Sequence, residues 1–344
     1  MKILLSHSWF EHKEPLVENF ARAFSLLGHE TKIFYDNDEK SFPYFLYKAL
    51  LRTPSRSLAL RALQYYREKR SRVFLKEIER FRPDFIFVLQ ASHISSTVPK
   101  MVAKRYKIPI ALWVADDTLT RHMFDPFFIE THFYYSHLFV ADEYWIPSLR
   151  LLGEAWISYL PFATSEEFFH PLHTKEDIDI VYVGLLGNGP NISKSVILSA
   201  LKDFNLTVAG PEITKHIGTI KTNNKINVLE GFLHSREINK LYNRAKIVLS
   251  LHHVQFKSDP GPRVFDAAAC RAFQLAEFRQ NIPALFDGKV VTFSSPHDLK
   301  TKVSYYLNHP AAREKNLEDC YRLALERHTY VARAAQVLKA VFDS

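Results

Sequence analysis

The feature that most constrains the fold is an alternation of strand-like and helix-like segments that begins again near residue 177. Short apolar runs such as Lys2–Ser6, Phe85–Gln90 and Ile110–Ala115 are typical of buried strands, and helix-patterned segments separate them. This alternation requires crossover connections, which make the strands parallel and put helices on both faces of the sheet. The sequence therefore predicts an α/β fold with two Rossmann-like doubly wound domains facing across a cleft.

A segment of loop composition, residues 161–176, separates the two halves and contains Pro161 and Pro171 among serine, threonine and charged residues. A chain of 344 residues suits two domains of roughly 150 residues better than one. We therefore expect a first domain over residues 1–160, a linker over 161–176 and a second domain over 177–325.

Cysteine content and hydropathy exclude several classes of protein. The two cysteines, Cys270 and Cys320, are too few for a disulfide framework or a cysteine-rich zinc site. The longest apolar stretch, Ile108–Ala115, is far below the ~18 residues that a membrane span needs. The first residues carry too short an apolar run for a signal peptide. We expect a cytoplasmic protein.

The basic excess lies in one segment. Lys48–Arg82 contains 11 Lys or Arg and three Glu, which accounts for the whole net charge of +8. Phe74, Ile78 and Phe81 recur there at helical spacing, and Pro54 is expected to divide the segment into two helices. A solvated helix face explains such a charge run. A cationic patch that binds an anionic membrane surface, an anionic glycan or a nucleic acid explains the same residues. Leucine and alanine, rather than base-stacking aromatics, alternate with the charges, which favours a membrane or a glycan.

A glycine-rich turn follows the predicted strand Asp179–Val183 and precedes a helix. Gly184 and Gly187 allow close approach of the backbone, and the start of the helix offers N–H groups and a positive dipole end to a phosphate. Lys194 in that helix would add a cation, and Gly210 marks a second turn after a strand. A tight turn without a ligand explains the same glycines.

The stretch Asp259–Glu277 is the most informative in the chain. A rigid Pro-Gly-Pro turn leads into a helix with Asp266 in its first turn and small alanines after it. A carboxylate there is a natural partner for the two hydroxyls of a ribose, and Arg263 would clamp a diphosphate. An acidic helix start beside a surface arginine explains the same residues without a ligand. Phe232, in EGFLH, is an aromatic that could stack on a nucleotide base.

In the first domain, Asp116 and Asp117 end the strand IALWVA, at the edge of the sheet where ligands bind. Asp116 would act as a base or orient a hydroxyl acceptor, with His93 as the second candidate. A polar cap and a structural histidine are the alternative readings. The triplets Asp36–Asp38 and Asp177–Asp179 are too short to indicate a metal. We expect no metal site and no cofactor.

The carboxyl-terminal half resembles a known group of proteins. The segments PRVFDAAACRAFQLAE and ERHTYVAR, with YLPFATSEEFFHP upstream, resemble the glycosyltransferase-like domain of the CgeB spore-maturation family. The resemblance spans about Leu160 to Leu338. The amino-terminal half is similar more loosely, through RPDFIFV and the strand that ends in Asp116 and Asp117.

The resemblance implies the B-type glycosyltransferase (GT-B) fold. In that fold the domain over 177–325 holds a nucleotide sugar, the domain over 1–160 takes the acceptor, and the final helix, within 326–344, braces the first domain. Asp266 stands where the family usually has a glutamate that contacts the ribose, and Arg263 and Phe265 belong to the same motif.

Together these observations predict a glycosyltransferase that moves a sugar from a nucleotide-diphosphate sugar, its co-substrate, to a hydroxyl acceptor. The acceptor would be a surface polysaccharide, a lipid-linked glycan or a glycoprotein, reached at the inner face of the cell membrane through Lys48–Arg82. One alternative is a non-catalytic sugar- or nucleotide-binding protein of the same fold, which Arg271 in place of a usual glycine favours. The other is a glycosyltransferase that acts on nucleic acid, although nucleic acid is the less expected partner.

Overall fold

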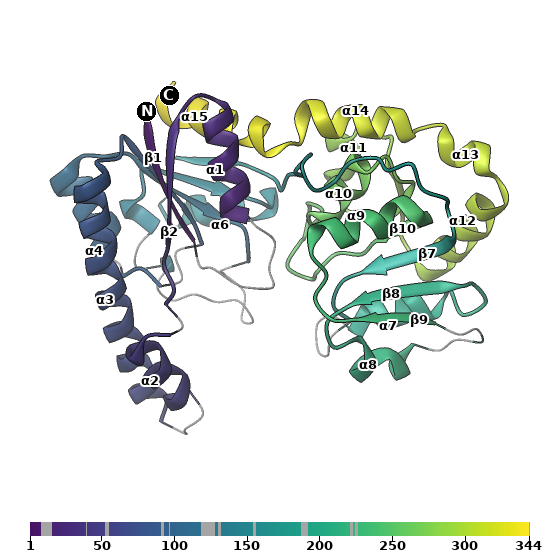
Figure 1. Cartoon of the computed structure of the whole chain (residues 1–344), viewed down its shortest axis with the longest axis horizontal. Helices are drawn as coiled ribbons and strands as arrows, with labels where there is room; N and C mark the ends of the chain where they lie inside the picture. The colour runs from purple at the N-terminus through teal and green to yellow at the C-terminus, as the bar shows by residue number, and fades with distance from the viewer. Residues whose placement is uncertain are drawn as a thin grey trace. The chain divides into compact units, whose positions relative to one another are not determined.

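The computed structural model describes residues 1–343 apart from 8–15, 39, 52–54, 91–92, 96, 118–127, 130–131, 154–155, 187–191, 221–222 and 224–225. The chain forms two compact units (Figure 1). The first contains the described residues up to Pro161 together with those from Arg333 onward, and the second runs from Phe162 to Ala332.

The first unit is built on a six-stranded sheet with the order β2-β1-β3-β4-β5-β6. Every neighbouring pair of strands is parallel. Its strands are β1 (Lys2–His7), β2 (Glu30–Tyr35), β3 (Phe85–Leu89), β4 (Ile110–Val114), β5 (His137–Val140) and β6 (Ile157–Tyr159). All five residues of β3 and all five of β4 are buried, as expected for central strands with helices on both faces.

The helices of the first unit follow the predicted alternation. They are α1 (Leu16–Leu26), α2 (Phe42–Leu50), α3 (Arg56–Phe81), α4 (Thr97–Met101), α6 (Ile146–Leu151), the short turns η1 (Val102–Tyr106), η2 (His132–Tyr134) and η3 (Glu143–Trp145), and most of α15 (Tyr330–Phe342). In α3, Phe74 and Ile78 are buried in the core cluster that also contains strand residues of the sheet. The helix ends at Phe81. The next residue, Arg82, has φ of +52° and donates its N–H to the Ile78 carbonyl just before Pro83.

The second unit repeats the plan with the order β12-β11-β10-β7-β8-β9, again with parallel neighbours. Its strands are β7 (Ile178–Val183), β8 (Leu206–Gly210), β9 (Asn227–Glu230), β10 (Ala245–Ser250), β11 (Gln274–Glu277) and β12 (Val291–Phe293). Its helices are α7 (Ile192–Ser199), α8 (Ile213–His216), α9 (Ser235–Arg244), α10 (Arg263–Ala269), α11 (Ile282–Leu285), α12 (Pro296–Asn308), α13 (Pro310–Glu314), α14 (Leu317–Arg327) and the turn η5 (Ile217–Thr219).

The structure confirms the doubly wound α/β class of both halves, and it adds one strand. β11 follows α10 after a connection of four residues and was not recognised from its pattern, because QLAE is too short to show a strand period. Among the described residues, no helix combines the length and the apolar character needed to cross a membrane.

Candidate active site

A histidine–carboxylate pair lies at the carboxyl edge of the first sheet. His93 Nδ1 is 3.3 Å from Asp36 Oδ1, and the Asp36 side chain is fully buried. Asp36 follows β2 and His93 follows β3, and the strand order puts both of these strands beside β1. A buried carboxylate in this position fixes the orientation of the imidazole.

Two tyrosine rings and an arginine of α3 lie around the pair of His93 and Asp36. The rings of Tyr66 and Tyr44 lie 5.7 and 6.4 Å from the His93 ring. Tyr66 accepts a hydrogen bond from the Asp38 N–H at 2.6 Å, and burial raises the pKa of its hydroxyl to about 12. The hydroxyl therefore stays protonated at neutral pH. The guanidinium of Arg70 donates to the Asp36 carbonyl at 3.1 Å, so α3 fixes the segment that presents the carboxylate.

Asp116 has a different partner from His93. Its Oδ2 accepts a hydrogen bond from the side-chain amide of Gln90, which directly follows β3 and has φ of +53°. Each of the two predicted catalytic residues therefore has a side-chain partner, Asp36 for His93 and Gln90 for Asp116. In the sequence, Asp36 stands out only as part of a short acidic triplet. Its position at the end of a strand was the signal that would have singled it out.

Glycines bring two strand ends of the second sheet together. The Gly184 N–H donates to the Ala209 carbonyl at 2.8 Å. A side chain on Gly210 would collide with the Gly184 carbonyl, and a Cβ on Gly184 would lie 2.7 Å from the Tyr182 hydroxyl. Close packing therefore requires both glycines whether or not a phosphate binds. Gly187 lies outside the described residues.

Lys194 reaches the same edge from α7. Its side chain is buried, and its Nζ donates to the Leu185 carbonyl at 3.3 Å and lies 6.0 Å from the centre of the Tyr182 ring. Burial lowers its pKa to about 8, and the negative charge of Glu277 opposes the shift. The charge of Glu277 compensates only part of the cost of desolvating this ammonium group. A second anion, such as a phosphate, would therefore stabilise the charged form of Lys194 further.

Glu277 and His252 were not predicted, yet they join this cluster. Glu277 ends β11, and its Oε2 accepts from the His252 N–H at 3.0 Å, while its Oε1 lies 3.2 Å from the Arg279 guanidinium. The His252 ring contacts the Glu277 carbonyl at 2.9 Å and the Gly261 N–H at 3.3 Å. Burial lowers the pKa of His252 to about 3, so the ring is neutral. Both residues sit at or just after the ends of strands, the position that pointed to Asp116.

Arg263 and Asp266 form a pair at the start of α10. Arg263 Nη1 lies 3.2 Å from Asp266 Oδ2, and Thr164 donates to Asp266 Oδ1 at 3.1 Å. The Asp266 side chain is 3% exposed, whereas that of Arg263 is 26% exposed. The carboxylate therefore holds the arginine, and the arginine is the group of the two that solvent reaches.

The two candidate aromatics differ in environment. Phe265 is completely buried and packs against the rings of Phe286 and His328 at 5.6 and 5.2 Å. It was predicted to bind the donor, but the structure makes it part of the core, because this position of α10 faces inward. Phe232, just after β9, is 55% exposed.

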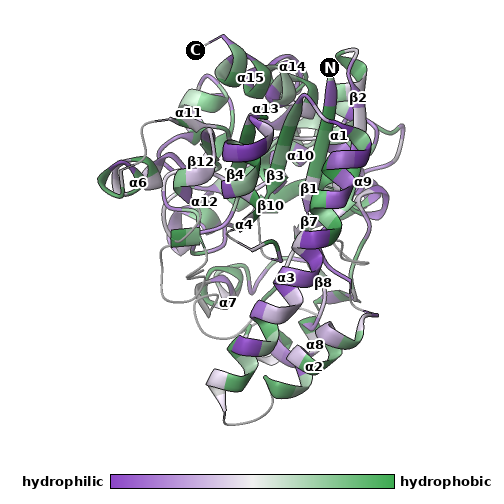
Figure 2. Cartoon of the chain, turned by 90° about the vertical axis from the view of Figure 1, so that its left-hand side faces the viewer, coloured by the Kyte–Doolittle hydropathy of each residue, from purple (hydrophilic) through white to green (hydrophobic). Residues whose placement is uncertain are grey.

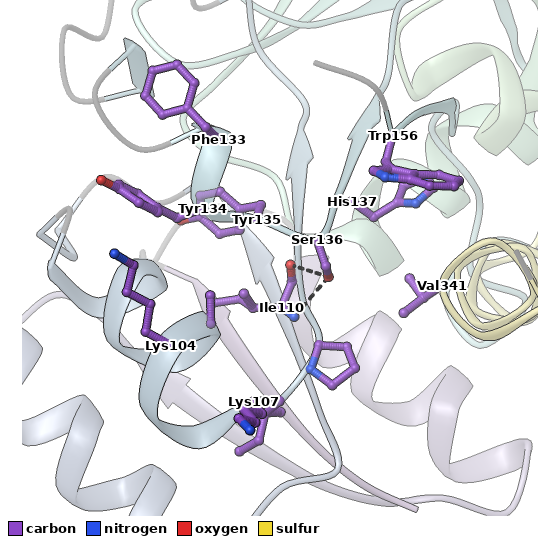
Figure 3. A pocket seen from close by; sticks show the side chains of 13 residues that line it. Lys104, Lys107, Ile110, Phe133, Tyr134, Tyr135, Ser136, His137, Trp156 and Val341 are labelled. Carbon is purple, nitrogen blue, oxygen red and sulfur yellow. Dashed lines mark hydrogen bonds between the residues drawn. The ribbon is translucent and has the colours of Figure 1, made fainter. Parts of the chain in front are cut away.

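One cavity of the first unit lies away from these residues. It has a volume of about 610 Å³ and is lined by residues that include Lys104, Ile110, Tyr134, His137 and Trp156 (Figure 3). Ile110 and His137 are the first residues of β4 and β5, so this cavity lies at the amino edge of the first sheet. Ligands of doubly wound sheets bind at the carboxyl edge, and we do not assign the transfer site to this cavity. Within the described part of the chain, no group of His, Cys, Asp and Glu side chains is arranged to hold a metal ion.

Two doubly wound units in one chain are the architecture of the GT-B fold, and solved structures agree with this fold. Sucrose-phosphate synthase from Thermosynechococcus elongatus is 13% identical with a TM-score of 0.69, covering 98% of this chain and 97% of that one. Anabaena HepE in complex with UDP is 12% identical with a TM-score of 0.64, covering all of both chains.

Sequence comparison narrows the class. Residues 194–339 match the sequence model of the family described as "Glycosyl transferase-like". Spore protein CgeB of Bacillus subtilis (strain 168) is 23% identical over 285 residues, covering 78% of this chain and 85% of that protein. Both matches support a CgeB-like glycosyltransferase family for this chain.

Proposed function

We propose that the protein transfers a sugar from a nucleotide-diphosphate sugar to a hydroxyl group of its acceptor. The observation that carries the proposal is a pair of cations in the second unit. Lys194 is buried beside the Tyr182 ring, and Arg263 is held by Asp266 at the start of α10. HepE, a similar structure, is described with UDP and with UDP-glucose, which supports a nucleotide donor for this chain.

The donor half of the reaction needs positive charge. The bond between the anomeric carbon and the diphosphate breaks toward the diphosphate, which takes the electron pair and leaves with extra negative charge. Cations fixed beside the leaving group stabilise that charge without reorganisation. Arg263, preset by Asp266, and Lys194, already desolvated, are suited to this role, and the reaction would then need no metal.

The acceptor half needs a base. The acceptor oxygen bonds to the anomeric carbon and loses its proton, and His93 would receive that proton while Asp36 stabilises the imidazolium. This assignment favours His93 over Asp116, because the buried Asp36 carboxylate beside His93 orients the imidazole and offsets the charge that it would gain. We propose a carbohydrate or a lipid-linked glycan as the acceptor.

A second candidate is transfer to nucleic acid. One similar structure is an α-glucosyltransferase in complex with UDP-glucose and DNA, 11% identical with a TM-score of 0.64, covering 99% of this chain and 98% of that one. Product analysis with glycan and DNA acceptors would separate the two candidates.

The test is calorimetry of UDP, GDP and dTDP binding to the full chain, to Arg263→Ala and to the control Lys240→Ala, an exposed residue of α9. We expect one nucleotide to bind, the Arg263 variant to lose about tenfold or more in affinity, and the control to bind normally. Turnover of the corresponding nucleotide sugar should persist in EDTA. Wild-type affinity in Arg263→Ala would remove the donor assignment, and binding without any turnover would leave a non-catalytic binding protein.

A further inference from the structure

The outer face of α3 carries a continuous charged stripe. Residues three or four positions apart line up on one side of a helix, and six residues of α3 with this spacing are all exposed. They are Leu58, Arg61, Tyr65, Lys69, Arg72 and Lys76. Phe74 and Ile78 of the same helix are buried in the core, so the stripe faces away from the sheet. Both views show α3 along the outside of the first sheet with α2 against its amino-terminal end (Figures 1 and 2).

The cations of this stripe are not used inside the protein. Among the described residues, Arg61, Lys69, Arg72 and Lys76 form no ion pair, and the Lys69 ammonium lies 4.9 Å from the centre of the Tyr65 ring. Arg67, by contrast, is buried and donates to the Ile94 carbonyl at 3.1 Å. The charged segment therefore divides into arginines that hold the fold and a row of basic residues that face solvent.

Large apolar side chains of α2 and α3 are also exposed to solvent. Phe42 and Phe45 of α2 are 72% and 67% exposed, and Leu58 and Leu60 of α3 are 49% and 55% exposed. Phe42 and Phe45 are three residues apart and share a face of α2. Single exposed apolar residues are ordinary, but Leu58 lies in the stripe itself and α2 packs against α3. Exposed apolar side chains and a row of cations therefore occur together on this pair of helices, which marks a contact surface.

We propose that α2 and the outer stripe of α3 dock on an anionic lipid surface. The cations would meet the headgroups while Phe42 and Phe45 enter the boundary between headgroups and acyl chains. A second copy of the chain is a poor partner, because a symmetric contact would set this row of like charges against itself. The only aromatic ring in the stripe, Tyr65, is already covered by Lys69, which disfavours base stacking on a nucleic acid. The proposal does not depend on the identity of the donor.

The experiment is sedimentation of the full-length protein with vesicles of phosphatidylcholine alone or with about 30% phosphatidylglycerol, in 0.1 M and 0.5 M NaCl. One variant combines Arg61→Gln, Lys69→Gln and Lys76→Gln, and a second combines Phe42→Ser and Phe45→Ser. A control removes three exposed charges elsewhere, by Lys104→Gln, Arg150→Gln and Lys240→Gln. Circular dichroism and nucleotide calorimetry check that each variant is folded and that the donor site is intact.

We expect wild type and control to bind only the anionic vesicles, and 0.5 M NaCl to weaken that binding. Each basic residue near the surface is worth about fivefold in affinity, so the charge variant should lose well over tenfold. The phenylalanine variant should lose affinity at both salt concentrations. The proposal would be overturned if the wild-type protein did not bind anionic vesicles, or if the charge variant bound them as well as the control does. Tight binding of DNA without any binding of vesicles would also overturn it. Self-association that Phe42→Ser and Phe45→Ser abolish, with no vesicle binding, would overturn it in favour of a second copy.

Discussion

The buried ammonium of Lys194 should make the stability of the second unit depend on pH in a direction that can be worked out. Burial lowers its pKa from an ordinary 10.5 to about 8. Between these values the unfolded chain holds a proton that the folded chain has released, so stability rises with pH across that window. The penalty for burying the charge is fully present below pH 8, and the lowered pKa corresponds to about 3 kcal/mol.

The substitution Lys194→Met keeps most of the side-chain volume and removes the charge. The variant loses the hydrogen bond to the Leu185 carbonyl, worth about 1 kcal/mol, so at pH 7 it should be more stable than wild type by about 2 kcal/mol. The advantage should shrink from pH 8 upward and vanish or reverse near pH 10.5. Urea unfolding followed by circular dichroism at pH 7, 8, 9 and 10 measures the difference, with Lys240→Met as the exposed control. A difference that stays constant over this range would refute the reasoning.

Three further predictions concern the other buried groups. Asp266→Ala should lower the free energy of unfolding by about 2–3 kcal/mol, because Thr164 loses its buried acceptor; a wild-type urea midpoint would contradict the interior role of this carboxylate. The unfolded chain protonates His252 between pH 6.5 and about 3 while the folded chain does not, so stability falls on acidification. His252→Gln should flatten the acid side of the thermal unfolding profile, and an unchanged slope would show that another group titrates there. His93→Ala and Asp36→Asn should each lower kcat by about a hundredfold with unchanged nucleotide affinity, and undiminished turnover would place the base elsewhere.

The fold could be predicted because its signal is local. Apolar runs of five or six residues, such as β3 (Phe85–Leu89) and β7 (Ile178–Val183), mark buried parallel strands by themselves, and the crossover rule then fixes the class. β11 (Gln274–Glu277) has only four residues and lacks that signal. The division of the basic segment into α2 and α3 was also predicted, and it is confirmed by helices that end at Leu50 and begin at Arg56.

The side-chain pairings could not be predicted, because they depend on the order of the strands. Asp36 and His93 are 57 positions apart and meet only because β2 and β3 both flank β1. Likewise, Asp266 was predicted as a ribose ligand from its place at a helix start, but its contact with Thr164, 102 positions away, is invisible in the local sequence. The positions of the strand ends in the sequence predicted where polar side chains would gather. They did not predict which of these side chains would be in contact.

Most of the last helix, α15, belongs to the first unit. Residues from Arg333 onward group with the first sheet, where Phe342 packs on Phe85 at 5.7 Å between ring centres and Arg333 donates to the Pro161 carbonyl at 2.9 Å. During synthesis, the first six strands therefore leave the ribosome long before the helix that covers part of their core. The second unit has all of its residues up to Ala332 before the last helix is synthesised, so it can fold earlier. The unit whose translation begins first is therefore the unit that is completed last.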